Sequence, residues 1–310
     1  MDAVRNTIAE NLGGPAEKLA TTQWSLEQCP DLSGKVAVVT GGSEGIGYGV
    51  TYTLLKNNID KLYIISMSQE VVDGAKDAIA KELGQDKADR THFLQCDLAD
   101  WKRVKDIAEQ IKSENNRLDI LVNNAGRGIQ TFAITEYGVD RHMALNHMGH
   151  VILTSHLLPL MKETAEKHDV VVRISNQASN IHQSAPSDTK FESLEELNQD
   201  IGPNPLYGRS KLANILYARY PLAGYAMAVG MEPFKKDQFQ GAVPTVYAVT
   251  TTKASGQYIC PPAVIEDGSE MSRDDALADR LMELTRKVVM EATKRESADK
   301  GCPFDDLVLH

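Results

Sequence analysis

The chain has 310 residues, of which 42% are hydrophobic and 25% charged, and a formal net charge of −10 at pH 7. This composition argues against disordered and fibrous classes. The negative charge, which no Lys/Arg-rich tract offsets, argues against nucleic-acid binding and favours a small-molecule partner.

The four cysteines are far apart in the sequence and form no CxxC or Cys/His cluster. We therefore expect reduced thiols, with neither a disulfide framework nor a metal site. No apolar run approaches the roughly 18 residues of a membrane helix, so no transmembrane segment is expected. Residues 1–14 lack the apolar block of a secretory signal, and Asp2 and Glu10 are unfavourable in a transit peptide. A cytoplasmic location follows, with a mitochondrial or membrane-associated one as the alternatives.

Residues 1–34 are predicted to form an N-terminal arm, because glycine and proline at 13–15 interrupt an early helical pattern. From 35 to 310 we expect one folded domain, in which short apolar runs alternate with amphipathic stretches. The predicted strands are residues 36–40, 62–66, 92–97, 118–123 and 170–175, and the predicted helices are 45–57, 69–83, 101–113, 139–161, 207–219 and 274–294.

Strands that alternate with helices at this spacing form right-handed βαβ units. The strand runs are apolar without alternation, which is typical of strands covered on both faces. The sequence therefore predicts an α/β fold: a Rossmann-like doubly wound parallel sheet with helices on both faces, in a single domain. Residues 180–206 carry three prolines and several acidic residues, and we expect a long surface excursion that acts as a lid or binding loop.

A glycine cluster, Thr40–Gly47 (TGGSEGIG), lies where the first strand turns into a helix. Gly41 permits the tight turn, Gly45 lets the backbone approach a pyrophosphate, and Gly47 lets the helix pack close to the strand. The helix N–H groups would face the phosphates. This strand–loop–helix context favours a dinucleotide-binding loop over a plain turn. Its other candidate cofactor contacts are Ser43, Glu44 and Ile46.

The TGxxxGxG spacing resembles that of the short-chain dehydrogenase/reductase family. The resemblance continues in order with Asn123–Gly126 (NNAG), Asn146–His150 (NHMGH) and Tyr207–Asn214 (YGRSKLAN). The last two are most similar to the retinol-dehydrogenase-like branch, and the whole chain is similar to oxidoreductases of filamentous fungi. The resemblance implies that Asn124, Ala125 and Gly126 contact the cofactor.

Tyr207 and Lys211 are four residues apart, so they lie on one face of a helix. A free tyrosine has a pKa of about 10, and a nearby cation stabilises its phenolate. Tyr207 would then be the general acid in reduction and the general base in oxidation. A YxxxK pattern alone is usually a solvated helix face, but here it follows a dinucleotide-binding motif and a fifth strand. The resemblance implies that both residues also contact the cofactor.

Two further catalytic residues are implied by the resemblance. Residues 173–179 (RISNQAS) match the family's RIVNVSS-like segment, so Ser179, not Ser175, would orient the carbonyl. Gln177 and Ala178 depart from that wording, and a plain loop hydroxyl is the alternative. Asn146 would break its helix locally and hold a water that links Lys211 to solvent, or would simply be a polar residue tolerated inside a helix.

The histidines beside Asn146 could suggest metal ligation. His147 and His150 are three residues apart and have no acidic residue nearby. We therefore expect surface or hydrogen-bonded histidines.

The end of the second strand determines cofactor choice in this fold. Ser66, Met67 and Ser68 stand there without a carboxylate, which favours NADP(H) over NAD(H), whereas Glu44 in the glycine loop favours the opposite. Asp97 with Leu98 matches the family residues that contact the adenine; a helix N-cap is the alternative for Asp97.

In the family, a further strand and a Pro-Gly turn follow the catalytic helix. Here residues 217–220 run directly into Pro221 with neither element visible. A βα unit needs about 30 residues, and its loss would expose a sheet edge. We therefore predict that the natural chain has a segment of about that length between Tyr220 and Pro221.

Together these patterns predict an oxidoreductase that transfers hydride between NADP(H) and a carbonyl or a secondary or primary alcohol of a small, lipophilic substrate. Residues 180–206 and the region after Pro221 would select that substrate. The alternative is a non-catalytic sensor of the nicotinamide cofactor, favoured by Gln177 and Ala178 and opposed by Asn146, Tyr207 and Lys211. Self-association through helices 139–161 and 207–219 is usual in the family, so a homo-oligomer is possible.

Overall fold

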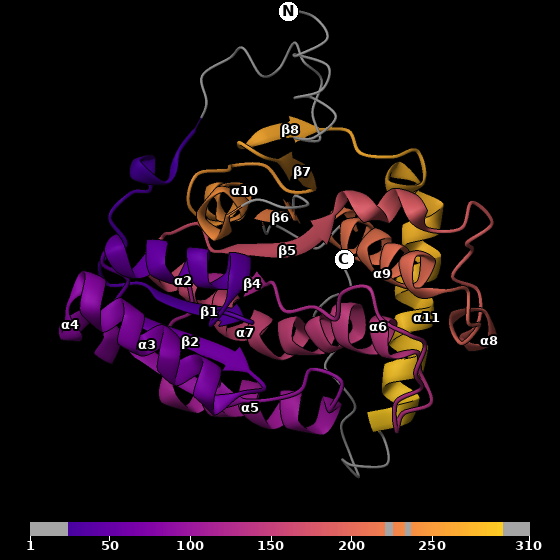
Figure 1. Ribbon diagram of the computed structural model, residues 1–310, viewed down its shortest axis with the longest axis horizontal. Coiled ribbons are helices and arrows are strands. Elements are labelled where there is room, and N and C mark those ends of the chain that lie inside the picture. Colours follow the sequence, from indigo (N-terminus) through magenta and orange to yellow (C-terminus); the bar gives the residue numbers. More distant parts are fainter. Residues whose placement is uncertain (1–23, 221–225, 233–236, 294–310) are drawn as a thin grey trace, which may run out of the picture.

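The computed structural model describes residues 24–220, 226–232 and 237–293. Within these ranges one eight-stranded sheet has the order β3-β2-β1-β4-β5-β6-β7-β8. Figure 1 labels its strands from β2, which lies next to the edge strand β3, to β8 at the opposite edge. All neighbouring strands are parallel except the last pair, β7 and β8. The strands are β1 Val36–Thr40, β2 Lys61–Ser66, β3 Thr91–Gln95, β4 Ile120–Asn123, β5 Arg173–Ser179, β6 Ala226–Glu232, β7 Gln257–Cys260 and β8 Val264–Glu266.

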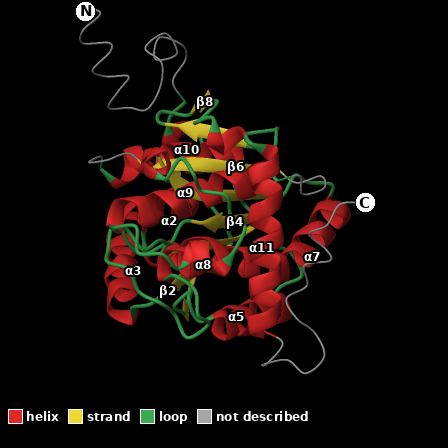
Figure 2. Ribbon diagram, turned by 90° about the vertical axis from the view of Figure 1, so that its right-hand side faces the viewer, coloured by secondary structure: helices red, strands yellow, loops and turns green. Residues whose placement is uncertain are grey.

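Helices cover both faces of the sheet. One apolar cluster joins it to α2, α3 and α10, and another joins its opposite face to α5, α7, α9 and α11. Figure 2 shows the strands stacked between helices from β8 down to β2. The α-helices are α2 Gly45–Lys56, α3 Gln69–Leu83, α4 Gln85–Asp89, α5 Trp101–Glu114, α6 Arg141–Met143, α7 His150–His168, α8 Leu194–Leu197, α9 Pro203–Arg219, α10 Gln238–Thr250 and α11 Asp275–Thr293.

The predicted fold class is confirmed. Every residue of β1 is buried, because its alternate side chains face the two helical layers. The predicted strand 36–40 has the observed bounds, whereas β5 begins later than expected and continues to Ser179. The predicted helix 139–161 is three pieces, since a π-helical turn, Ala144–Gly149, separates α6 from α7. We call this segment the π turn.

The expectation that no strand follows α9 is wrong. Strand β6 pairs in parallel with β5 over seven residues and with β7 on its other side. Its sequence, AMAVGME, has one β-branched residue and a glycine, so its local signal is weak. Pairing along both edges stabilises this strand in spite of its low β propensity. The absence of a strand therefore no longer supports the predicted segment between Tyr220 and Pro221, which stays a prediction; Pro221 lies outside the described residues.

Part of the predicted N-terminal arm packs on the domain. Cys29 and Leu32 are buried in the cluster beneath α2, with Trp24 against it, and residues 1–23 lie outside the described ranges. The order of the strands reverses between β1, which is followed by β2, and β4, which lies on its other side. In such sheets ligands bind beyond the carboxyl ends of the two strands that flank this switch point.

The predicted excursion 180–206 is docked on the domain. It contains a 3-10 turn, Asn180–Ser184, and α8. Asn198 joins it to the loop before α6: the Asp140 N–H donates to Asn198 Oδ1 at 2.9 Å, and Asn198 Nδ2 donates to the Gly138 carbonyl at 2.7 Å. The buried Arg209 donates to the carbonyls of Glu196 and Leu197.

Candidate active site

The glycine loop brings the start of α2 against the end of β1. A Cβ on Gly47 would lie 2.0 Å from the carbonyl oxygen of Gly41, so only glycine allows this approach. Gly45 has φ +53°, and a Cβ placed there would have no atom within 4 Å. The loop therefore leaves open space beside the N-terminus of a 12-residue helix, whose N–H groups and dipole favour an anion such as a pyrophosphate.

The end of β4 is fastened to the glycine loop. The hydroxyl of Thr40 accepts hydrogen bonds from the backbone N–H groups of Asn124 at 2.8 Å and Ala125 at 2.9 Å. The side-chain amide of Asn124 donates to the Thr40 carbonyl at 3.0 Å. These bonds hold β1 and β4 together at the switch point of the sheet.

A cavity of about 510 Å³ opens at this point. It extends from the glycine loop past the ends of β2 and β4 to the first turns of α9. Thirteen predicted cofactor residues line it: Gly41, Glu44, Gly45, Ile46, Ser66, Met67, Ser68, Leu98, Asn124, Ala125, Gly126, Tyr207 and Lys211. A nicotinamide dinucleotide fits this arrangement, because the anion-binding loop and the Tyr207/Lys211 pair line one cavity.

The remaining predicted residues do not line the cavity. Gly47 lies behind the loop, and the Ser43 hydroxyl donates to Ser66 Oγ at 3.3 Å, which ties the loop to β2. Asp97 forms an ion pair with Arg141, and its carboxylate accepts the N–H of Ala99. The alternative that Asp97 is a helix N-cap is wrong, because Asp100 caps α5.

Tyr207 and Lys211 lie together on α9, as their spacing predicts. Both are buried, and Lys211 Nζ is 5.5 Å from the centroid of the Tyr207 ring. Lys211 Nζ also donates to the carbonyl oxygen of Gln177 on β5 at 2.9 Å. This bond fixes the ammonium between β5 and the tyrosine.

Asn146 lies in the π turn, so the predicted local break of the helix is confirmed. Its Nδ2 donates to Ser210 Oγ at 2.8 Å and to the Arg127 carbonyl at 3.0 Å, and its Oδ1 accepts the Arg127 N–H at 2.7 Å. A Cβ on Gly126 would be 3.3 Å from Lys211 Nζ and 3.5 Å from Asn146 Oδ1. The amide and the ammonium therefore face the same glycine.

Ser179, at the end of β5, is buried but does not line the cavity. Its hydroxyl accepts the N–H of Ile181 at 3.3 Å and so caps the 3-10 turn. Gln177, two residues earlier on the same strand, does line the cavity. The structure thus brings together Asn146, Tyr207 and Lys211, and leaves the Ser179 hydroxyl to the turn.

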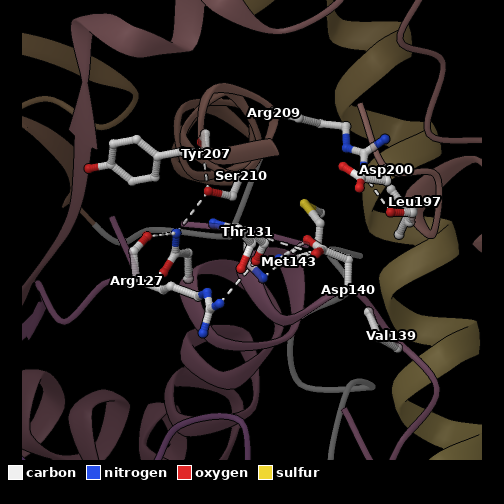
Figure 3. A network of polar contacts seen from close by, with 12 residues as sticks. Arg127, Thr131, Val139, Asp140, Met143, Leu197, Asp200, Tyr207, Arg209 and Ser210 are labelled. Carbon is white, nitrogen blue, oxygen red and sulfur yellow. Dashed lines mark hydrogen bonds and ion pairs between the residues drawn. The ribbon is translucent and has the colours of Figure 1, made fainter. Parts of the chain in front are cut away.

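Several site residues were missed by the sequence analysis. Ser210 links α9 to the π turn, since its hydroxyl donates to the Tyr207 carbonyl at 2.7 Å and accepts from Asn146; Figure 3 shows it between Tyr207 and Arg127. Its position beside Lys211 in YGRSK could have indicated this. The missed cavity-lining residues are Ile65, Val71, Cys96, Arg127, Gly128, Gln130, Arg141, Leu145 and Gln177.

Two of the side chains that line the cavity have shifted pKa values. Burial raises the pKa of the Cys96 thiol to about 12, so it stays protonated and unreactive. Desolvation, followed by repulsion from Arg141, lowers the pKa of the Arg127 guanidinium, whose Nη2 donates to the Thr131 carbonyl at 3.0 Å.

In the described part of the chain, no helix is long and apolar enough to cross a membrane.

The fold and the cavity define a Rossmann-type protein whose site lies at the switch point of a doubly wound sheet. Residues 35–191 match the family model described as short chain dehydrogenase, and the chain belongs to that family. It is an NAD(P)-dependent oxidoreductase of this family, as expected from its motifs.

Relatives are similar over most of the chain, and a solved structure shares its fold. A Neurospora crassa protein named as the mitochondrial oxidoreductase bli-4 is 56% identical over 349 residues, covering 100% of this chain and 85% of that protein. An oxidoreductase of Schizosaccharomyces pombe is 31% identical and covers 92% of each. A structure from Mycobacterium paratuberculosis has a TM-score of 0.70 at 22% identity, covering 86% of this chain and 97% of that one. The expected similarity to oxidoreductases of filamentous fungi is confirmed.

Proposed function

We propose that this enzyme transfers hydride between a nicotinamide cofactor and a carbonyl or the corresponding secondary or primary alcohol. The supporting observation is that the glycine loop, Tyr207 and Lys211 line one cavity, and that the Asn146 amide faces the same glycine as the Lys211 ammonium. The bound nicotinamide would supply or accept the hydride. Tyr207 would give a proton to the carbonyl oxygen in reduction and take it back in oxidation.

The neighbours of Tyr207 suit this proton transfer. The Lys211 ammonium, held by the Gln177 carbonyl, favours the phenolate that remains after the proton has left. Three hydrogen bonds fix the amide of Asn146. By the family resemblance, we propose that Asn146 holds a water molecule between Lys211 and solvent. We propose that Ser179 orients the carbonyl, which requires its hydroxyl to turn away from the 3-10 turn when substrate binds.

A non-catalytic cofactor sensor is the second candidate, and the capping role of the Ser179 hydroxyl favours it. Tyr207→Phe separates the two functions. We expect this variant to bind NADPH as the wild type does, and to lose about 10²- to 10⁴-fold in kcat on ketones and aldehydes. A wild type that binds cofactor without turning over any ketone, aldehyde or alcohol of a broad panel would favour the sensor.

For the cofactor, we propose NADP(H) rather than NAD(H). Ser66 and Ser68 line the cavity at the end of β2, where they can donate to a 2′-phosphate, and no carboxylate stands there. Glu44 lines the same wall and would repel that phosphate. Glu44→Gln should therefore tighten NADPH binding by roughly tenfold and change NADH binding little. Fluorescence titration with both cofactors tests this, and tighter binding of NADH by the wild type would contradict the preference.

We propose a lipophilic substrate, selected by residues 180–206 and the region after Pro221, and a cytoplasmic location. The Neurospora relative is named as mitochondrial, so imaging of a fluorescent fusion would decide the location. Self-association through α9 would have little surface to use, because residues 206–218 are all buried within one chain and α11 packs on this helix (Figure 1).

A further inference from the structure

The side chain of His150 binds a backbone carbonyl of the π turn. In a regular α-helix the N–H of His150 would donate to the carbonyl of Asn146. Here it donates to the carbonyl of His147. The Asn146 carbonyl lies 3.0 Å from Nδ1 of the His150 ring. The imidazole therefore holds Asn146, whose amide faces the same glycine as the Lys211 ammonium.

The neighbours of His150 determine which of its nitrogens carries the hydrogen. A carbonyl only accepts, so Nδ1 must be the donor to Asn146. Nε2 is then an acceptor, and it lies 2.8 Å from Thr40 Oγ1. The ring is 2% exposed, and burial lowers its pKa to about 4, so it stays neutral at neutral pH. The Thr40 hydroxyl consequently donates to His150.

This donation orients the Thr40 oxygen. With its hydrogen directed at His150, its lone pairs face the N–H groups of Asn124 and Ala125, at 2.8 and 2.9 Å. The other acceptor within reach of this hydroxyl is the Val122 carbonyl at 3.4 Å. Without His150 the hydroxyl would turn toward that carbonyl and its lone pairs would turn away from the two amides. Asn124 and Ala125 both line the cavity.

We propose that His150 is a positioning residue that couples the cofactor-binding edge of the sheet to Asn146. Its Nδ1 holds the π turn, and its Nε2 holds Thr40 and, through Thr40, the N–H groups of Asn124 and Ala125. The effect on turnover rests on the proposed function, whereas the effect on cofactor binding does not.

His147 provides a matched control in the same turn. It is also fully buried, and burial lowers its pKa to about 3. Its Nε2 lies 2.9 Å from Thr285 Oγ1 on α11. Thr285 does not line the cavity. His147→Phe should therefore lower the thermal stability and leave cofactor binding unchanged.

Two substitutions separate the two nitrogens of His150. Asparagine places an amide N–H near the position of Nδ1, and glutamine places an amide oxygen near that of Nε2. His150→Asn should keep the hydrogen bond to the Asn146 carbonyl and lose the hydrogen bond to Thr40. It should raise the Kd for NADPH and NADH about tenfold. His150→Gln should bind both cofactors within about twofold of the wild type, but lower kcat about tenfold, because Asn146 is less well held.

Cofactor titration, thermal unfolding and steady-state kinetics on these variants test the proposal. Cofactor binding by His150→Asn at wild-type strength would overturn it, and so would an equal loss of binding in His147→Phe. A wild type that binds cofactor without turnover would refute the proposed function only, since the titrations still decide the coupling.

A measurement on the wild type tests the proposal even where the variants do not fold. The ¹⁵N NMR spectrum of histidine-labelled protein should show a buried, neutral imidazole with hydrogen on Nδ1, and cofactor should shift its Nε2 resonance. Hydrogen on Nε2 of His150 would contradict the direction of both bonds and overturn the proposal.

Discussion

The two buried histidines of the π turn should make the protein sensitive to mild acid. Burial lowers the pKa of His147 to about 3 and that of His150 to about 4, from about 6.5 in the unfolded chain. As the pH falls, the unfolded chain takes up protons before the folded protein does. The stability linked to the neutral rings is therefore complete above about pH 6.5 and is lost as the pH falls toward 4 and 3.

The size of this loss can be worked out at pH 5. One pH unit corresponds to about 1.36 kcal/mol for each proton, and pH 5 lies about 1.5 units below the pKa of an unfolded histidine. Each ring should thus remove about 2 kcal/mol from the free energy of unfolding between pH 7 and pH 5, and the two together about 4 kcal/mol. Both folded values lie below 5, so the result depends little on their size.

Urea unfolding at pH 7 and pH 5 measures this difference. His147→Phe and His150→Phe should each lose about 2 kcal/mol less than the wild type between the two pH values, whatever their stability at pH 7. The other titrating groups are common to all the proteins and cancel. Equal losses in the wild type and both phenylalanine variants would refute the reasoning.

Three other outcomes are expected. Gly47→Ala places a Cβ 2.0 Å from a carbonyl oxygen of the glycine loop. In urea unfolding it should lower the free energy of unfolding by about 1–3 kcal/mol, and it should abolish cofactor binding. Gly74→Ala, in open space on α3, should stabilise by about 0.5–1 kcal/mol in the same urea assay. Glu196 accepts three successive backbone N–H groups of the loop before it, so Glu196→Ala should speed limited proteolysis within residues 185–193, and an unchanged cleavage rate would refute this role. If a further segment lies between Tyr220 and Pro221, the intact mass of the natural protein exceeds 34.1 kDa; a mass of 34.1 kDa would exclude it.

Features that depend on local periodicity were predictable from the sequence. The unbroken apolar run of β1 marks a strand buried on both faces, and its predicted bounds are those observed. The spacing of Gly41, Gly45 and Gly47 predicts the tight turn and the close approach of α2. Tyr207 and Lys211 lie together because four residues make about one helical turn.

Features that depend on contacts between distant segments were not predictable. Strand β6 has a weak local signal and is paired along both edges. Asp97 pairs with Arg141, 44 residues away, and Asp100 caps α5 in its place. Ser179 follows the family wording in the sequence, but its hydroxyl is used by the turn that the chain makes immediately afterwards.

The sequence by itself thus determined the fold class, the glycine loop and the helix face that carries Tyr207 and Lys211, because periodicity and spacing are properties of neighbouring residues. The tertiary structure decided the role of the NHMGH segment, in which His147 contacts α11 and His150 contacts β1. A buried polar atom must find a partner in whichever element the fold places beside it. That requirement links residues as far apart as Thr40 and His150, and sequence spacing cannot reveal it.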